Sequence, residues 1–339
     1  MALVAPRKSL TLQSTRPLDL GGSLFSVGDL YPKLKTFAAG LREAGLGESR
    51  LFFAKVDVQA CFDTVPQEYL VEVITALLSA DSYRVNQHAE VKPPEALPPG
   101  QHSLDSKPVV KYLADAQPGD QLPRRVQSVK NVHVHGTSVT VGPLGQQSHR
   151  THKILALLKE HVECNVVKIG KKYYRQKNGI PQGSVLSSLL CNFFYGKLEK
   201  EVLQFVARPD TILLRLIDDF LLITPERALA ETFLRTMHNG VPEYGISVKR
   251  EKSLVSFDYN FDGLHIPRAD GPCFPYCGMS IDTSNLNIRK DAERKAKTSQ
   301  IMPPSVQLPY LTISPDISDS LTVEYTRLPG RTFRRKALK

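Results

Sequence analysis

The sequence has little that would cross a membrane or build a disulfide framework. Its 339 residues include no Trp and only five Cys, which are scattered without repeated CxxC pairs. Scattered thiols favour reduced cysteines in a cytosolic or nuclear setting. No apolar run approaches the roughly 18 residues that a membrane-spanning helix needs, and the first residues lack the charged-then-apolar order of a secretory signal. We therefore expect an intracellular protein with no membrane contact.

Positive charge is what the sequence has in excess. Lys and Arg outnumber Asp and Glu by 44 to 34, which gives a formal net charge of +10. This excess favours a polyanionic partner such as nucleic acid, although ribosomal proteins, membrane-surface proteins and simply basic enzymes share it. A chain of this length holds one large domain or two ordinary ones.

The most informative stretch is the apolar run 213–223, which carries Asp218 and Asp219 at its centre. The run has strand composition, and it is too short and too polar in the middle for a buried helix. It predicts a β-hairpin with both carboxylates at the tip. Adjacent carboxylates repel each other unless a cation lies beside them. From this stretch alone, an ordinary acidic turn is an equal alternative.

A second carboxylate follows an earlier strand. A helical period begins near Leu30 and ends at the glycines after residue 44, and the aromatic and β-branched run 51–58 then predicts a buried strand that carries Asp57 at its end. The next segment predicts a helix that begins with Pro66 near its first position and runs to about Leu77. Asp63 precedes that proline, so its residue type and place favour a capping role.

A glycine-flanked turn lies between these two acidic segments in the sequence. Residues 179–183 read Gly-Ile-Pro-Gln-Gly and precede a long amphipathic helix that we expect from Val185 to about Phe205. The glycines allow close backbone approach of a ligand, and the helix N-terminus suits a phosphate. A plain loop-to-helix junction is the alternative.

Residues 86–145 differ in character from the segments around them. Proline and glycine pairs interrupt the pattern, and only 124–141 alternates as strands do, so we expect a partly flexible insertion. Four histidines suggest a metal site, but nearby cysteines do not complete a ligand set, and we expect no structural zinc. These histidines are His133, His135, His149 and His152.

Four more elements are expected downstream. A helix begins after Thr224-Pro225 and closes at Gly240, and residues 246–257 predict a strand or strand pair that carries Lys252. Residues 274–288 predict a hairpin with a Thr-Ser-Asn turn, and the charged segment 289–297 predicts a helix.

Together, the acidic segments indicate phosphoryl chemistry. Strand-borne carboxylates can hold two Mg²⁺ ions about 4 Å apart, which bridge an attacking oxygen and a phosphate. Hard oxygen ligands suit Mg²⁺, and nucleotide phosphates complete its octahedron. The three candidate ligands are Asp57, Asp218 and Asp219. The reaction that this set favours is in-line nucleotidyl transfer.

The order and spacing of these segments resemble the reverse transcriptases, and among them the telomerase family in its fungal forms. The Arg-Leu-Ile-Asp-Asp-Phe form of 215–220, the insertion after the first acidic strand and the Tyr-Cys-Gly of 276–278 favour telomerase over retroviral, retron and intron enzymes. The segments that resemble family motifs are A (53–67), B′ (178–187), C (214–222), D (244–252) and E (274–278).

The resemblance implies a role for each residue that matches a catalytic position. Asp57, Asp218 and Asp219 would form the metal-binding triad, and the backbone carbonyl of Val58 would be an additional ligand. Lys252 would protonate the leaving pyrophosphate; a solvated strand lysine is its alternative.

The resemblance also implies binding roles. Phe62 would lie beneath the sugar of the incoming nucleotide and disfavour a ribose 2′-OH. Gln182 and Gly183 would line the pocket for nucleotide and template. Cys277 and Gly278 would belong to the primer grip that holds the DNA 3′ end, with an ordinary half-buried thiol as the alternative for the cysteine.

The fold implied is an α+β reverse transcriptase palm, an antiparallel sheet backed by helices, with a partial fingers insertion and a truncated thumb. The resemblance covers roughly residues 18–297 and again 318–339. The expected parts are a fingers remnant and lead-in (1–50), palm with motif A (51–85), fingers insertion (86–150), palm with motifs B′ to E (151–297), an atypical insert, unspliced or disordered (298–317), and the start of the thumb (318–339).

The activity implied is that of an RNA-directed DNA polymerase, which adds telomeric repeats to chromosome 3′ ends with two Mg²⁺ ions. Its partners would be a telomerase RNA template, telomeric single-stranded DNA, deoxynucleoside triphosphates and accessory telomere proteins, in the nucleus at the telomere. Two alternatives stay open. One is an inactive truncated fragment that only binds nucleic acid. The other is the reverse transcriptase of a non-telomeric retroelement, although no endonuclease, RNase H or integrase segment is visible.

Overall fold

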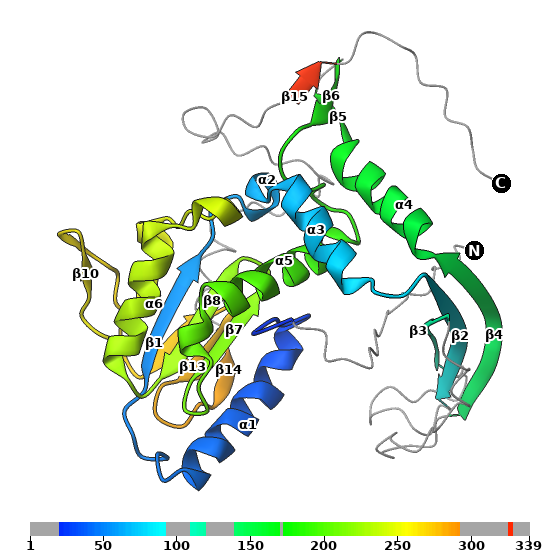
Figure 1. The fold of residues 1–339 in the computed structure, drawn as a ribbon. Helices are drawn as coiled ribbons and strands as arrows, with labels where there is room; N and C mark the ends of the chain where they lie inside the picture. The colour runs from blue at the N-terminus through cyan, green and yellow to red at the C-terminus, as the bar shows by residue number, and fades with distance from the viewer. Residues whose placement is uncertain (1–19, 93–108, 120–138, 170–171, 292–324, 328–339) are drawn as a thin grey trace, which may run out of the picture. The chain divides into compact units, whose positions relative to one another are not determined.

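The structure is a computed structural model that describes residues 20–92, 109–119, 139–169, 172–291 and 325–327. These residues divide into two compact units (Figure 1). Within the described part, the first unit lies in 74–159, and the second comprises the residues before 74 and after 159. Helices and antiparallel strands occur together in the second unit, which confirms the expected α+β class.

The second unit is built on a four-stranded antiparallel sheet of order β7-β8-β1-β9. Its central strands β1 (Phe52–Asp57) and β8 (Asp219–Thr224) are the two acidic segments predicted from the sequence. They are flanked by β7 (Ile212–Leu216) and β9 (Leu254–Val255). Both central strands are apolar along almost their whole length because helices or other strands cover both faces of the sheet.

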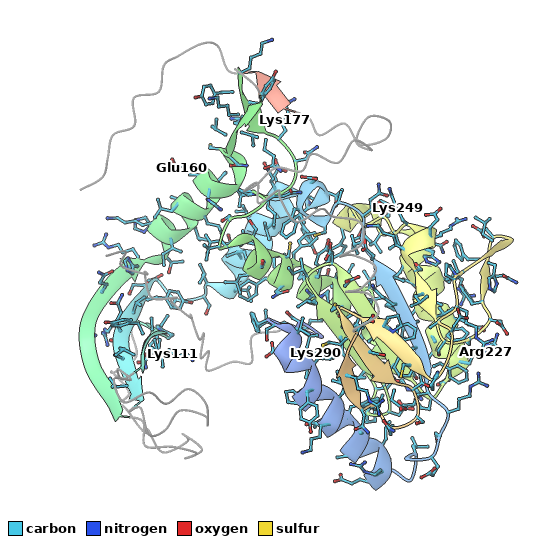
Figure 2. All side chains as sticks on the ribbon, turned by 180° about the vertical axis from the view of Figure 1, so that it is seen from behind. Lys111, Glu160, Lys177, Arg227, Lys249 and Lys290 are labelled. Carbon is cyan, nitrogen blue, oxygen red and sulfur yellow. The ribbon has the colours of Figure 1, made fainter. Side chains whose placement is uncertain are left out.

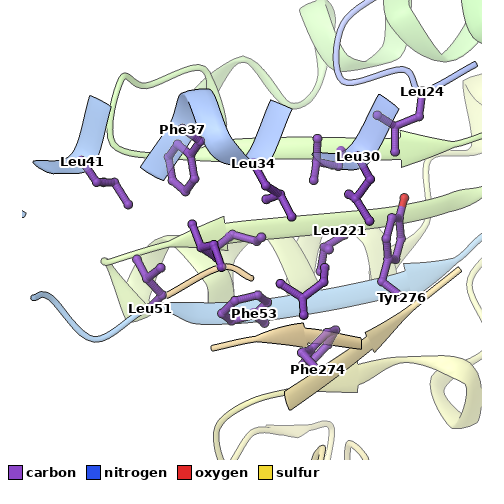
Figure 3. Packing of buried hydrophobic residues seen from close by; sticks show 14 residues of the cluster. Leu24, Leu30, Leu34, Phe37, Leu41, Leu51, Phe53, Leu221, Phe274 and Tyr276 are labelled. Atoms are coloured by element: carbon purple, nitrogen blue, oxygen red, sulfur yellow. The ribbon is translucent and has the colours of Figure 1, made fainter. Parts of the chain in front are cut away.

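One face of this sheet packs against α1 (Leu30–Glu43), a helix that the sequence predicted. The helix buries residues spaced by three or four positions, which form one apolar stripe: Leu30, Leu34, Phe37 and Leu41. Figure 3 shows this stripe beside Phe53 and Leu221, and Phe274 of β12 packs against Phe53 in the same cluster. Truncation of a core phenylalanine such as Phe53 to Ala typically destabilises a domain by about 3–5 kcal/mol.

Helices α5 (Ser187–Glu201) and α6 (Arg227–Asn239) cover the other face. α6 begins where the Glu226 amide donates to the Thr224 hydroxyl, and it ends at Gly240, which has φ +75°, as predicted. α5 differs from the prediction because it is shorter and is followed by the 3₁₀ turn η4 (Gln204–Val206). It is buried around most of its surface rather than on one stripe.

The segment after α6 contains less strand than predicted. A short turn η5 (Pro242–Tyr244) is followed by the 3₁₀ turn η6 (Arg250–Lys252), so Lys252 does not lie on a strand. Two short strands, β10 (Asn260–Phe261) and β11 (Leu264–His265), form a small ribbon.

Residues 273–290 form two hairpins, where the sequence predicted one. Strands β12 (Cys273–Tyr276) and β13 (Met279–Asp282) are joined by Cys277 and Gly278, both at positive φ, as a type I′ turn requires. β14 (Ile288–Lys290) then pairs with β13 across the predicted Thr-Ser-Asn turn. β14 also replaces the start of the helix predicted over 289–297, and the residues after 291 lie outside the described ranges.

Two short helices connect β1 to the first unit. Asp63 lies inside α2 (Cys61–Thr64), and α3 (Gln67–Leu77) begins three residues later. The prediction that Asp63 caps the helix that follows Pro66, which is α3, is therefore wrong. A three-stranded sheet of order β15-β6-β5 comprises Tyr325–Arg327, Lys172–Gln176 and Val166–Ile169.

The first unit contains a three-stranded antiparallel sheet of order β3-β2-β4. Its strands are β3 (Val109–Pro118), β2 (Ser82–Lys92) and β4 (Val139–Arg150), and helix α4 (Thr151–Glu163) follows. β2 and β3 were not predicted, although β2 alternates apolar and polar residues. Most of the strand predicted over 124–141 lies outside the described residues, as do His133 and His135.

The surface of the described residues is rich in cations. Arg227, Lys249 and Lys290 are exposed, and Figure 2 shows them on the second unit. The five cysteines, all within the described ranges, are free thiols, as expected. No helix in the described part of the chain is long and apolar enough to cross a membrane.

Candidate active site

The Asp-Asp hairpin has a two-residue turn made of Ile217 and Asp218, and Leu216 pairs with Asp219 across it. Asp219 is thus the first residue of β8, and only Asp218 lies at the tip where both carboxylates were predicted. Ile217 has φ +59°, a region that β-branched residues rarely enter. Such a conformation costs about 1–3 kcal/mol and persists only where the surroundings hold it.

Three aspartates meet at this end of the sheet. Asp57 is the last residue of β1 and the direct cross-strand partner of Asp219, so the two side chains share one face. The amide of Val58 donates to the Asp218 carbonyl oxygen at 3.1 Å, which fastens the turn to the end of β1. Asp57, Asp218, Asp219 and Val58 therefore lie at the same end of the sheet.

Two lysines neutralise part of this charge. Lys252 Nζ lies 3.4 Å from Asp57 Oδ1, and Lys55 Nζ lies 3.3 Å from Asp219 Oδ1. The Lys252 side chain is 57% exposed, whereas that of Lys55 is 15% exposed. Sequence reasoning missed Lys55. Its signal was the spacing, because a residue two positions before Asp57 on a strand lies on the same face.

The carboxylates keep an uncompensated part of their negative charge. Burial, and then the charges of Asp219 and Asp57, raise the pKa of Asp218, while Lys252 opposes this shift. Asp219 Oδ1 is buried, and despite the nearby ammonium it accepts no hydrogen bond from any residue that the structure describes. A buried oxygen without a hydrogen bond favours the approach of a cation.

The donor set fits a hard divalent cation in ligand type and location. Carboxylate oxygens are the ligands that Mg²⁺ prefers, and three of them lie at one end of the sheet. Within the described ranges, however, no three acidic, His or Cys side chains converge closely enough to hold a metal ion. Lys55 and Lys252 instead hold two of the carboxylates, so an ion at this place competes with both ammonium groups.

The β12–β13 hairpin holds the Asp-Asp turn from one side. The Tyr276 hydroxyl accepts from the Leu216 amide at 3.1 Å and donates to the Asp219 carbonyl at 2.9 Å. The Cys277 thiol lies 3.6 Å from Asp219 Oδ2, and burial with this carboxylate raises the pKa of the thiol to about 12. Cys277 therefore stays protonated, while Gly278 completes the turn. Tyr276 received no role from the sequence, although it directly precedes Cys277.

The glycine-flanked loop is fastened to α2. The Ile180 amide donates to the Phe62 carbonyl at 2.6 Å, and the Gln182 amide group donates to Asp63 Oδ2 at 3.3 Å. Gly179 has φ +76°, and a Cβ there would lie 2.2 Å from the Phe62 carbonyl oxygen. Gly179 is thus required by protein packing rather than by a ligand.

Gly183 differs from Gly179 in its surroundings. It also has a positive φ, +78°, but a Cβ there would meet no described atom within 4 Å. Close approach of a ligand backbone, expected from the sequence at both glycines, therefore has room only at Gly183.

Residues 143–295 match the family model described as Reverse transcriptase (RNA-dependent DNA polymerase). The telomerase reverse transcriptase of Canis lupus familiaris is 33% identical over 336 residues, which cover 96% of this chain and 27% of that protein. That of Oryza sativa subsp. japonica is 28% identical over 310 residues, which cover 84% of this chain and 23% of that protein. The chain thus spans about a quarter of the length of these curated relatives.

Two solved structures resemble the fold. Apo telomerase from Candida tropicalis matches with a TM-score of 0.55 and 20% identity, over 86% of this chain and 39% of that chain. Telomerase from Candida albicans, in complex with a TWJ fragment of telomeric RNA, matches with a TM-score of 0.53 and 21% identity, over 82% of this chain and 36% of that chain. At such identities the likeness concerns the fold alone.

Proposed function

We propose that this chain, a homologue of telomerase reverse transcriptases along 96% of its length, carries the polymerase site of an enzyme that extends telomeric DNA. The enzyme would add deoxynucleotides to a DNA 3′ end on an RNA template, at the telomere in the nucleus. The observation that supports this most is the meeting of Asp57, Asp218 and Asp219 at the end of one sheet, in a segment order shared with that family.

The three aspartates and the Val58 carbonyl would hold two Mg²⁺ ions. When bound, such ions activate the attacking 3′ hydroxyl and stabilise negative charge on the phosphate. The protein's own part is to fix the carboxylates through the bond from the Val58 amide to the Asp218 carbonyl. Lys252, whose exposed side chain lies on the turn η6 next to Asp57, supplies the proton for the leaving pyrophosphate.

The remaining site residues would bind the substrates. Phe62 lies below the sugar of the incoming nucleotide, and Gln182 and Gly183 line the pocket for nucleotide and template. Cys277 and Gly278 hold the primer 3′ end. The proximity of the thiol to Asp219 supports this last assignment, because a primer terminus must lie next to the carboxylates that activate it.

Primer extension tests the proposal with one substitution and one matched control. The chain is given an RNA template, a DNA primer, deoxynucleotides and Mg²⁺. Asp218→Ala is expected to lower incorporation by at least about a thousandfold with the fold intact. Asp258→Ala removes an exposed carboxylate that pairs with Arg268, and it is expected to leave incorporation unchanged.

Two outcomes would contradict this function. Full activity of the Asp218→Ala variant would remove the aspartates from catalysis. Binding of template and primer by the wild-type chain without any incorporation would favour the alternative of a nucleic-acid-binding fragment. The occupation of two carboxylates by lysines is the observation that favours this second function.

A further inference from the structure

Arg215 lies within strand β7, two residues before the Asp-Asp turn, among apolar neighbours. Its side chain is fully buried, with 0% exposure. Nε donates to Glu199 Oε1 on helix α5 at 2.6 Å, and Glu199 is itself 8% exposed. A buried charge is costly to keep unless it is paired and its hydrogen bonds are satisfied.

The guanidinium uses its other donors on backbone and amide oxygens. Nη1 donates to Asn192 Oδ1 at 3.0 Å, and Nη2 donates to the carbonyl oxygens of Asn192 and Leu20, each at 3.3 Å. The rings of Tyr195 and Phe220 lie 5.5 and 5.6 Å from its central carbon. The planar fork of arginine satisfies this set, whereas the single ammonium of lysine cannot.

These contacts connect the catalytic hairpin to two other segments. Nη1 also lies 3.5 Å from the carbonyl oxygen of Ile217, the strained turn residue. The main chain of Arg215 exchanges hydrogen bonds with Gly22 and Leu24, at 2.8 and 2.7 Å. Glu199 closes the arrangement by accepting from the Gly22 amide at 2.6 Å.

The partner helix α5 is the element that follows the Gln182-Gly183 loop. The proposed metal ligands and the proposed nucleotide pocket therefore stand on separate elements, which Arg215 joins through Glu199 and Asn192. We propose that Arg215 is a positioning residue that sets the Asp218-Asp219 turn relative to α5, and so relative to the incoming nucleotide. This inference rests on the polymerase function proposed above.

The test uses the whole chain and compares Arg215→Lys with Leu41→Ala. Leu41 is 4% exposed on α1, in the apolar cluster on the face of the sheet that α1 covers, and its truncation supplies a loss of stability through apolar packing alone. Both variants are studied at a temperature where they are folded. The two readouts are amide hydrogen exchange over 216–220, and kcat and KM for single-nucleotide incorporation.

Arg215→Lys is expected to speed exchange in the turn and to lower kcat/KM by about 10–100-fold, since small misplacements of reacting groups have effects of this size. Leu41→Ala is expected to change neither. Glu199→Gln keeps an acceptor for Arg215. It is expected to speed exchange in the turn and to lower kcat/KM, each by less than Arg215→Lys does. It also serves as the test if Arg215→Lys does not fold.

The outcomes separate this inference from the proposed function. If the wild-type chain incorporates no nucleotide, the polymerase proposal fails, while hydrogen exchange still reports whether Arg215 fixes the turn. If the wild-type chain is active and Arg215→Lys matches Leu41→Ala in both readouts, the positioning role is overturned.

Discussion

Lys55 is the residue that most changes the description of the site. Its ammonium lies beside Asp219 Oδ1 and is largely shielded from water, so it offsets charge that a metal ion would otherwise offset. A Mg²⁺ ion bound at the proposed site would therefore compete with Lys55 for the same carboxylate. The ion pair of Lys55 with Asp219 reduces the repulsion among the carboxylates, and it would lower the affinity of the proposed site for Mg²⁺.

Substitution of Lys55 by Met tests this competition. The metal-free protein is expected to lose about 2–4 °C in Tm, because Asp219 loses its ion pair. Its affinity for Mg²⁺ is expected to rise; a tenfold lower Kd adds about 1.4 kcal/mol of stabilisation at saturating ion. Thermal unfolding with and without Mg²⁺ measures both effects. Lys35→Met, an exposed change on α1, is the control, and an equal Mg²⁺-induced shift in the two variants would refute the competition.

His238 makes the free energy of unfolding depend on pH, which the sequence did not suggest. Burial, and then the charge of Arg250, lower its pKa to about 4, and Nδ1 is buried without a hydrogen bond within the described structure. A histidine with a lowered pKa takes up its proton more readily in the unfolded chain. Its contribution to stability is thus present above pH 6.5 and is lost as the pH falls towards 4.

Replacement of His238 by Gln is expected to flatten this part of the stability curve. Denaturant unfolding between pH 7 and pH 4 should show a smaller loss of stability than in the wild-type chain. His265→Gln changes an exposed imidazole and should leave the curve unchanged. Equal curves for wild type and the His238 variant would contradict the lowered pKa.

At the scale of single residues, the sequence singled out positions whose side-chain type by itself suggests a chemical role. The aspartates were found because paired carboxylates inside apolar strands are hard to explain otherwise. Lys55 and Tyr276 were missed because each acts through a contact between strands distant in sequence. Asp63 was assigned as a cap from local pattern, whereas the structure places its carboxylate against Gln182.

At the scale of elements, the two glycines of one loop have different tasks. Gly179 allows the loop to pack on the Phe62 carbonyl, and Gly183 faces open space. Both have positive φ, so alanine strains the backbone at either position, by about 1–2 kcal/mol. Only at Gly179 is a steric clash added to this strain.

Alanine substitutions are expected to separate these tasks. Gly179→Ala should lower stability by clearly more than Gly183→Ala, because its Cβ would meet the main chain of α2. Gly183→Ala should keep a folded chain but weaken nucleotide binding, seen as a raised KM. Denaturant unfolding and incorporation kinetics measure the two effects. Equal losses of stability in the two variants would contradict this prediction, because they would mean that the clash of the Cβ at position 179 with the Phe62 carbonyl adds no cost.

Elements with clear periodicity and stop signals were predictable, and those without were not. α1 and α6 each combine a 3.6-residue apolar period with a glycine at the end. The Cys277-Gly278 turn was missed because it lacks the Asn-Gly or Asp-Gly pair that marks most type I′ turns. Ile217 is likewise atypical, since its type disfavours the conformation that it adopts.

At the scale of the whole molecule, the residues that flank the segment 82–150 lie next to each other. The Thr151 amide donates to the Asp81 carbonyl at 2.9 Å, so the ends of this segment are in contact. Within the described residues of this segment, the strands pair with one another in the order β3-β2-β4. The domain boundary that the sequence suggested at 86–150 stays a prediction, and these contacts define how to test it.

Excision of 82–150 with a short Gly-Ser linker is expected to leave a folded chain. Because residues 81 and 151 are already in contact, a short linker between them closes a loop at little cost in conformational entropy. The second unit should therefore unfold cooperatively, with a Tm within about 5 °C of that of the parent chain. Circular dichroism and thermal unfolding check this. An aggregated or molten product would mean that the sheet of the first unit is required for folding of the second unit.

Template-directed incorporation is the measurement that tests the proposed polymerase site. The chain is supplied with a DNA primer, Mg²⁺ and four RNA templates that differ only in the base opposite the next position. We expect the added deoxynucleotide to follow the templating base in each case, and Asp57→Asn to abolish addition on all four templates. Addition that ignores the template, or that survives the loss of Asp57, would contradict this expectation.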